Sequence, residues 1–148
     1  MTFPTVMPAP RAVLFDLDGT LADTAPDLAA AVNWLRTERG LDPTPYEVLR
    51  PTASAGARGM IGAAFGLAPG DEGYEELRLA WFDRYQSAMA LHTTLFDGIV
   101  ELLAGIEEAG MAWGIVTNKP MRFTDPLVPQ IALDHAGCIV SGDTTPHA

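Results

Sequence analysis

Hydrophobic residues follow two different patterns along this chain. Short continuous apolar runs at 12–15, 113–116 and 138–141 are typical of strands in a parallel sheet that is covered on both faces. Between the first two runs, over residues 25 to about 91, apolar residues recur at helical spacing instead, and no strand pattern is present. The sequence therefore predicts an α/β protein in which a helical segment is inserted between two strands.

The inserted segment is expected to contain helices at 25–39, 46–49, 54–65 and 71–91. Thr24 and Pro26 provide a capping hydroxyl and a first-turn proline for the first helix, and Gly40 provides its stop. The third helix contains glycines three residues apart, so that either a packed helix or a substrate can approach it closely. The fourth helix carries aromatic residues at helical spacing, which usually form a packed core.

Two more helices are expected after the insert, at 98–110 and 121–133. The second contains Pro126 and Pro129, which predicts two short pieces or a kink because proline removes a backbone donor. A strand, helix, strand order implies a right-handed parallel crossover. The strand ending at Val116 is therefore expected beside the strand ending at Phe15.

These patterns divide the chain into three parts. Residues 1–24 are the first part of a Rossmann-like sheet core, residues 25–92 are the helical insert, and residues 93–148 are the second part of the core. Because the first and third parts supply neighbouring strands, we expect them to fold together as one sheet.

Polar side chains follow both of the strands that should be neighbours. Asp16 and Asp18 come after the first strand, and Thr117 and Asn118 come directly after the second. Ligands of open parallel sheets bind beyond the carboxyl ends of the strands, so these side chains are expected to share a pocket. Repulsion between two carboxylates at this spacing raises a pKa or recruits a cation, and Mg²⁺ suits carboxylate and carbonyl oxygens.

The acidic pair has two other interpretations. An acidic surface turn with no chemical role is the plain alternative for Asp16 and Asp18. An EF-hand loop is a second alternative, but Leu21 stands where that loop needs glycine and Asp27 stands where it needs glutamate. The EF-hand is therefore excluded.

Composition and charge exclude some classes of partner. A net charge of −10 over 148 residues disfavours nucleic acid and anionic membranes, because neither offers this chain a favourable field. No apolar run approaches the ~20 residues of a membrane span, and residues 1–10 lack the basic start of a signal peptide. The single cysteine, Cys138, cannot form an internal disulfide and lies in an apolar run, so we expect it to be packed and the protein to be cytoplasmic.

The acidic stretch also carries a family resemblance. The residues Val-Leu-Phe-Asp-Leu-Asp-Gly-Thr, which start at position 13, resemble motif I of the haloacid dehalogenase superfamily. The resemblance implies that Asp16 is a nucleophile that forms an aspartyl-phosphate, and that Asp18 protonates the leaving group and then helps to activate water. It also implies that Mg²⁺ is bound by the carboxylate of Asp16 and the backbone carbonyl of Asp18.

The second polar group and the insert extend the resemblance. Val-Thr-Asn-Lys-Pro resembles motif II, which implies that Thr117 and Asn118 hold phosphoryl oxygens. The insert is similar to the C1 cap of this superfamily, a lid that reads the substrate. Arg58 and Lys119, the single lysine, are candidates for contacting the substrate, although an exposed Arg58 is the plain alternative. The acidic and hydroxyl side chains at 23 and 24 are expected to cap the first helix of the insert.

The resemblance implies a Mg²⁺-dependent phosphate monoester hydrolase that acts on a small phosphorylated metabolite. Phosphoglycolate is the first candidate ester and N-acetylmuramic acid 6-phosphate is the alternative. A phosphomutase of the same fold would use the same acidic pair. An inactive phosphate-binding or interaction module is the alternative outside enzymes.

The superfamily also uses a motif III lysine and motif IV acids, and neither is found in this sequence. Lys119 belongs to motif II and is not expected to replace the motif III lysine. We therefore expect these residues to be the N-terminal part of a longer enzyme, to be poorly stable and nearly inactive alone, and the first strand to have an open edge. A homo-oligomer that buries this edge is a further expectation.

Overall fold

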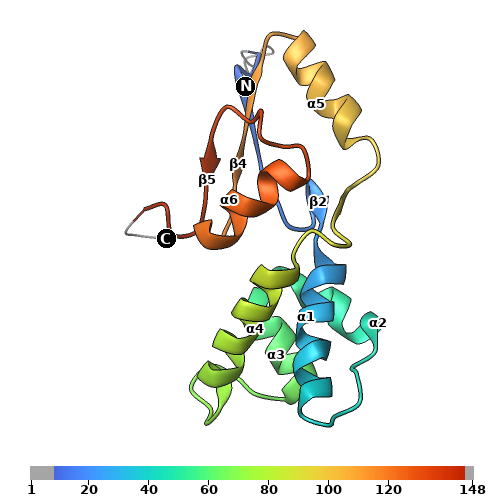
Figure 1. Ribbon diagram of the computed structural model, residues 1–148. Helices are drawn as coiled ribbons and strands as arrows, with labels where there is room; N and C mark the ends of the chain where they lie inside the picture. Colours follow the sequence, from blue (N-terminus) through green and yellow to red (C-terminus); the bar gives the residue numbers. More distant parts are fainter. Residues whose placement is uncertain (1–8, 146–148) are drawn as a thin grey trace, which may run out of the picture.

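The structure is a computed structural model that describes residues 9–145 (Figure 1). A small parallel sheet with two helices occupies one end of the molecule, and a group of helices occupies the other end. Most of residues 1–10, the stretch without the basic start of a signal peptide, lies outside the described residues. Within the described range, no helix combines the length and the apolar character that crossing a membrane requires.

The sheet consists of β1 (Ala12–Phe15), β4 (Ala112–Val116) and β5 (Ile139–Val140), in the order β1-β4-β5. Both pairs are parallel, with Phe15 beside Ile115 and Ile115 beside Ile139. The predicted parallel crossover that places β4 next to β1 is confirmed. The carboxyl ends of these strands therefore meet at one edge of the sheet.

β1 differs from the prediction in its burial. It pairs with β4 alone among the described strands, and the side chain of Leu14 is 61% exposed. The expectation of a strand covered on both faces is therefore wrong for β1 in this structure, whereas the open edge expected there is present. Cys138, just before β5, is exposed, so the expectation that it is packed is also wrong. Both residues lie at the margins of a narrow sheet, where few side chains can cover them.

Residues 25–88 contain helices and loops without a strand, as the periodicity predicts. The helices are α1 (Ala25–Glu38), α2 (Tyr46–Leu49), the 3₁₀ helix η1 (Arg50–Ala55), α3 (Gly56–Phe65) and α4 (Tyr74–Ala88). The apolar face of α1 is buried through Leu28, Val32 and Leu35. We call residues 25–88 the helical part.

The glycine-rich stretch forms two helices where one was predicted. Gly56 has a φ of +57°, which glycine adopts readily, and this residue separates η1 from α3. A Cβ on Gly59 would lie 2.2 Å from the carbonyl oxygen of Thr52 in η1. The glycine at 59 therefore permits close packing of α3 against η1, which is the helix-packing interpretation of this stretch.

The chain passes between the two ends of the molecule through a feature that the sequence did not predict. β2 (Ala22–Asp23) and β3 (Thr94–Leu95) form an antiparallel pair. Next to this pair, the buried carboxylate of Asp27 accepts hydrogen bonds of 2.7 to 3.1 Å. The donors are the backbone N–H groups of His92 and Thr93 and the Thr93 hydroxyl. Strands of two residues are too short to give a periodic signal. The outgoing and returning segments are thus tied together.

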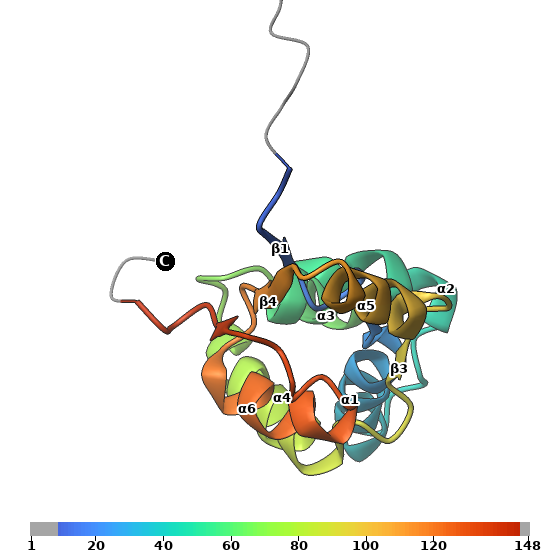
Figure 2. The same cartoon turned by 90° about the horizontal axis from the view of Figure 1, so that it is seen from above.

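Two helices flank the sheet, α5 (Ile99–Glu108) and α6 (Met121–Gln130). The view from above places α6 over α4 (Figure 2). The rings of Phe82 in α4 and Phe123 in α6 are in contact, with their centroids 5.2 Å apart. Of the two outcomes predicted from Pro126 and Pro129, two short pieces is wrong, because α6 is a single helix. Both prolines lie on its exposed face, where the carbonyl groups that lose an N–H partner can face water. The buried face, which includes Phe123 and Leu127, holds the helix in place.

One hydrophobic cluster runs through the molecule from the helical part into the sheet. On one side it contains Val32 and Trp81, and on the other it contains Trp113, Ile115 and Leu127. Because the same apolar contacts join both ends, the helical part is held against the carboxyl edge of the sheet.

Candidate active site

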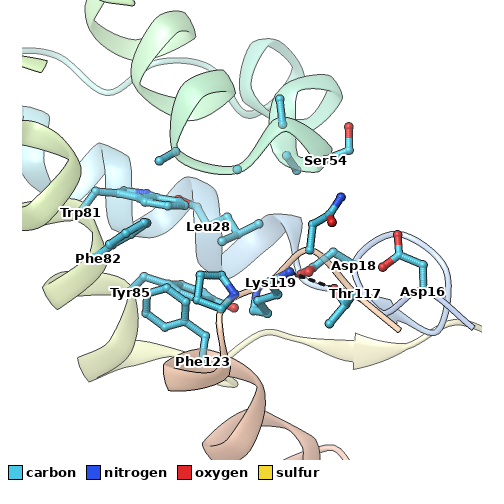
Figure 3. A pocket seen from close by; sticks show the side chains of 16 residues that line it. Asp16, Asp18, Leu28, Ser54, Trp81, Phe82, Tyr85, Thr117, Lys119 and Phe123 are labelled. Atoms are coloured by element: carbon cyan, nitrogen blue, oxygen red, sulfur yellow. Dashed lines mark hydrogen bonds and ion pairs between the residues drawn. The ribbon is translucent and has the colours of Figure 1, made fainter. Parts of the chain in front are cut away.

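A cavity of about 380 Å³ lies between the carboxyl ends of β1 and β4 and the helical part (Figure 3). The sheet side supplies Asp16, Asp18, Thr117, Asn118 and Lys119. The structure thus brings together the two acids and the two motif II residues that the sequence had grouped. They meet because β1 and β4 are parallel neighbours, so that the loops after both strands leave from the same edge.

Asp16 lies at the start of a tight turn that follows β1. Its Oδ1 accepts a hydrogen bond of 2.7 Å from the N–H of Leu17, and Oδ2 accepts none from residues 9–145. Leu17 is fully buried and anchors the turn, while Gly19 has a φ of +75° that allows the chain to reverse. The local fold therefore leaves one carboxylate oxygen of Asp16 available to a ligand.

Asp18 is held by two side chains from different segments. Its Oδ1 accepts hydrogen bonds from the Thr24 hydroxyl at 2.5 Å and from the Lys119 ammonium at 2.9 Å. The expectation that Thr24 caps α1 through its side chain is therefore wrong, because its hydroxyl points to Asp18 and α1 has no side-chain cap. Asp23 forms a 2.9 Å ion pair with Arg50 and does not cap α1 either.

Lys119 is buried, although it carries a charge. Its Nζ lies 4.7 Å from the centroid of the Tyr85 ring as well as against Asp18. Burial alone would lower the pKa of Lys119, but the nearby Tyr85 and Asp18 outweigh burial and raise the pKa above its usual value. The ammonium therefore stays protonated at neutral pH. Sequence reasoning placed Lys119 in the site region but had no signal for its contact with Tyr85.

The other candidate cation lies elsewhere. Arg58 is exposed on α3 and is not among the residues that line the cavity. The structure therefore does not bring Arg58 to the site, and the exposed-surface interpretation fits its position. Ser54 and Gly56, at the junction of η1 and α3, do line the cavity. Within the glycine-rich stretch, Gly56 thus lines the cavity, whereas Gly59 packs against η1.

The helical part supplies a group of aromatic residues that the sequence analysis assigned to the core only. Trp81, Phe82 and Tyr85 project from α4 toward the cavity on the side away from Asp16 (Figure 3). Burial raises the pKa of Tyr85, although Lys119 opposes this effect. Its hydroxyl is the one buried side-chain polar atom of the described residues that has no hydrogen-bond partner. The aromatic residues at helical spacing in 71–91 were the sequence signal that could have indicated this side of the cavity.

The donor set is small but suits one kind of cation. Within residues 9–145, no three or more His, Cys, Asp or Glu side chains gather as a metal site. Mg²⁺ is commonly held by one or two carboxylates, with water and substrate phosphate completing its octahedral shell. The carboxylate of Asp16, a residue that lines the cavity, fits that requirement, and Asp18 lies beside it.

The fold and the site define an α/β protein in which carboxylates follow one strand of a parallel sheet and face a group of helices. A family model described as haloacid dehalogenase-like hydrolase matches residues 13–148. The chain belongs to the haloacid dehalogenase-like hydrolase family. The α/β fold class and the family resemblance predicted from the sequence are confirmed.

Named relatives are found within this family. The chain is 49% identical over 123 residues to N-acetylmuramic acid 6-phosphate phosphatase of Pseudomonas putida. This match covers 83% of this chain and 55% of that protein. It is 42% identical over 136 residues to phosphoglycolate phosphatase of Xanthomonas campestris pv. campestris, covering 91% of this chain and 61% of that protein. This chain therefore spans little more than half the length of the curated relatives that it matches.

Solved structures show the same fold. A crystal structure from Haemophilus somnus 129PT, described as a predicted phosphoglycolate phosphatase, matches with a TM-score of 0.74 and 20% sequence identity. The match covers 93% of this chain and 65% of that chain. At this identity the likeness shows the fold alone.

Proposed function

We propose that the protein hydrolyses a phosphate monoester through an aspartyl-phosphate on Asp16. The observation that carries this proposal is that Asp16, Asp18 and Thr117, from the ends of two neighbouring strands, line one cavity. Phosphoryl transfer needs a nucleophile in line with the leaving oxygen, groups that hold the equatorial oxygens, and a proton donor. Membership of the family and the phosphatase names of two relatives support the same reaction.

In the first half of the proposed reaction, Asp16 Oδ2 attacks phosphorus. A bond forms between this oxygen and phosphorus, the bond from phosphorus to the alcohol oxygen breaks, and Asp18 gives its proton to that oxygen. The hydroxyl of Thr117 and the amide of Asn118 hold phosphoryl oxygens. Phosphoryl oxygens also compete with Asp18 for the Lys119 ammonium, which would free Asp18 to carry the proton.

In the second half, water attacks the phosphorus of the aspartyl-phosphate. The proton of the water passes to Asp18, the bond from Asp16 to phosphorus breaks, and inorganic phosphate leaves. The hydrogen bonds that Thr24 and Lys119 donate to Asp18 hold its carboxylate in place for this proton transfer.

We propose Mg²⁺ as the cofactor, in agreement with the resemblance of motif I. The carboxylate of Asp16 and the backbone carbonyl of Asp18 would hold it, with substrate and water as the remaining ligands. When bound, Mg²⁺ would neutralise negative charge on the phosphoryl oxygens.

The substrate is proposed to be a small phosphorylated metabolite. Phosphoglycolate and N-acetylmuramic acid 6-phosphate are the two candidates, since each occurs in the name of a curated relative. The cavity of about 380 Å³ has room for more than a two-carbon acid, which favours the sugar ester. We also propose the cytoplasm as the compartment, because one cysteine in the chain fits a reducing environment.

The proposal is tested by measuring phosphate release from both esters in the presence of Mg²⁺. We expect Asp16→Asn to lower kcat by at least about a thousandfold relative to the parent protein, because the nucleophile is removed. Asp125→Asn, an exposed aspartate of α6 outside the cavity, is the matched control and should keep its rate. Turnover that survives Asp16→Asn would rule out the aspartyl-phosphate.

Product analysis separates the alternatives. A phosphomutase would return a phosphorylated isomer in place of inorganic phosphate, while using the same Asp16 and Asp18. A phosphate-binding module would bind the ester with Mg²⁺ and release nothing. The open edge of β1 makes a homo-oligomer a further proposal, which sedimentation of the protein would test.

A further inference from the structure

The segment after β5 lies against the turn that carries the motif II side chains. We call residues 117–121 the motif II turn and residues 141–145 the β5 loop. The two segments are neighbours because each follows one strand of the parallel pair β4 and β5 (Figure 1). The backbone N–H of Gly142 in the β5 loop donates to the carbonyl of Lys119 in the motif II turn at 3.0 Å. The β5 loop is therefore placed to fix the path of the motif II turn.

Gly142 stands where a side chain has no room. A Cβ on this glycine would lie 2.3 Å from the carbonyl oxygen of Asn118 and 2.9 Å from its carbonyl carbon. Both atoms belong to the backbone of the motif II turn, so they cannot swing aside as the end of a flexible side chain could. A methyl group at 142 would therefore displace the turn or the β5 loop.

The contact at Gly142 reaches the hydroxyl that is proposed to hold phosphate. The carbonyl of Asn118 and the N–H of Lys119 belong to one planar peptide group, so a shift of the carbonyl also moves the N–H. This N–H donates to Oγ1 of Thr117 at 3.1 Å. Because the Thr117 oxygen accepts this hydrogen bond, its own proton stays available for a phosphoryl oxygen.

Asp143 holds the other end of the motif II turn. Its Oδ1 accepts a hydrogen bond of 2.7 Å from the backbone N–H of Met121, the first residue of α6. Pro120, the N-cap residue of α6, makes no side-chain cap, so Asp143 supplies a partner for this N–H from outside the helix. Ser141 and Thr124 are buried, and their hydroxyl groups are hydrogen-bonded to each other, which attaches the β5 loop to α6 as well.

We propose that Gly142 and Asp143 are positioning residues for the motif II turn, which fix its backbone so that Thr117 and Asn118 are in place before phosphate binds. The identity of this ligand rests on the proposed function, whereas the effect on the turn does not depend on turnover. Neither Gly142 nor Asp143 lines the cavity, so both act through the turn. Groups that are held in place in advance need little ordering on binding.

Amide hydrogen exchange of the free protein, measured by NMR, tests the role of Gly142. We expect Gly142→Ala to speed exchange of the Lys119 amide by at least about tenfold, because the hydrogen bond to Thr117 is disturbed. Gly105→Ala is the matched control, since a Cβ on this exposed glycine of α5 would meet no atom within 4 Å. Unchanged exchange at Lys119 in Gly142→Ala, or an equal increase there in Gly105→Ala, would overturn the role.

Asp143→Ala tests the second contact and also tests the inference if Gly142→Ala does not fold. The amide of Met121 should exchange about three- to tenfold faster in this variant. Asp143→Asn keeps an oxygen that can accept the hydrogen bond and should restore a rate close to that of the parent. Parent-like exchange in Asp143→Ala, or no restoration in Asp143→Asn, would overturn the role of Asp143.

Binding of inorganic phosphate with Mg²⁺, measured by titration calorimetry, separates this inference from the proposed function. We expect Gly142→Ala to weaken binding by about tenfold and Gly105→Ala to leave it unchanged. If the parent binds no phosphate while exchange at Lys119 rises in Gly142→Ala, the proposed function fails and the positioning of the turn stands. If the parent and Gly142→Ala bind phosphate equally well, the hydrolase proposal stands and the positioning inference fails.

Discussion

The ammonium of Lys119 donates a hydrogen bond to Asp18 at 2.9 Å and lies over the ring of Tyr85, 4.7 Å from its centroid. Asp18 belongs to the turn after β1, and Tyr85 belongs to α4 in the helical part. One buried lysine thus connects the acidic pair to the helices that face it. Its charge, its burial and its two partners lead to several measurable consequences.

Lys119→Met should keep most of the side-chain volume but remove the partner of Asp18. Since the carboxylate of Asp18 then loses a charged hydrogen bond in a mostly buried place, we expect the free energy of unfolding to fall by about 1 to 3 kcal/mol. Urea denaturation measures this loss. In the Asp18→Asn background, Lys119→Met should lower the free energy of unfolding by less than it does in the wild-type background. Equal losses in the two backgrounds would show that the Lys119–Asp18 pair contributes nothing to stability.

Thr24→Val removes the hydroxyl that donates to Asp18 and keeps the side-chain shape. We expect kcat for the hydrolysed ester to fall by roughly five- to tenfold with little change in KM, because Asp18 is less well held while the phosphate contacts remain. Helix content by circular dichroism should not change, since Thr24 makes no side-chain cap. Thr37→Val, on the exposed part of α1, should leave kcat unaltered. A change in KM alone would contradict the role given to Thr24.

Asp27→Ala should be among the more destabilising substitutions at the junction of the two ends. It removes a buried carboxylate that accepts hydrogen bonds from His92 and Thr93, and leaves their N–H groups without that partner. We expect the free energy of unfolding to fall by about 2 to 4 kcal/mol. Asp42→Ala, at an exposed position, should change it by less than about 0.5 kcal/mol. Similar losses of unfolding free energy in the two variants would show that the hydrogen bonds from His92 and Thr93 to Asp27 do not stabilise the protein.

Alkaline pH should destabilise the protein through Lys119 and Tyr85 together. The pKa of each group is raised in the folded protein, so each holds its proton more tightly when folded than when unfolded. Their contribution is therefore complete below about pH 10, where the unfolded groups begin to titrate, and is lost as pH rises through the folded pKa values.

Thermal unfolding between pH 8 and 11.5 measures this decline. Tyr85→Phe removes one of the two groups and should make the decline shallower. At neutral pH the same variant should be as stable as the parent or more stable by up to about 1 kcal/mol, because the hydroxyl it removes has no partner in the described structure. Stability that stays constant up to pH 11.5 would show that the folded protein holds these protons no more tightly than the unfolded chain does.

The sequence alone was sufficient to predict the arrangement of strands and site residues wherever a local pattern could be combined with a general rule of chain topology. Apolar runs that end at Phe15 and Val116 specify strands, and the right-handed crossover rule makes them neighbours. The polar residues that follow, including Asp16 and Thr117, then had to meet at one edge of the sheet. Helical spacing was equally informative for α1 and α4, since amphipathic periodicity depends only on residues close in the sequence.

The tertiary structure decided every property that depends on which distant groups come within contact distance. The hydroxyl of Thr24 could have capped α1, but the nearby carboxylate of Asp18 accepts it instead. Pro126 and Pro129 predicted two short pieces or a kink, and packing of the opposite face keeps α6 a single helix. Arg58 and Lys119 were both candidate cations, and only the fold placed Lys119 in the cavity. Spacing along the chain determines helices, strands and their order, whereas partners are set by packing between segments that no local pattern connects.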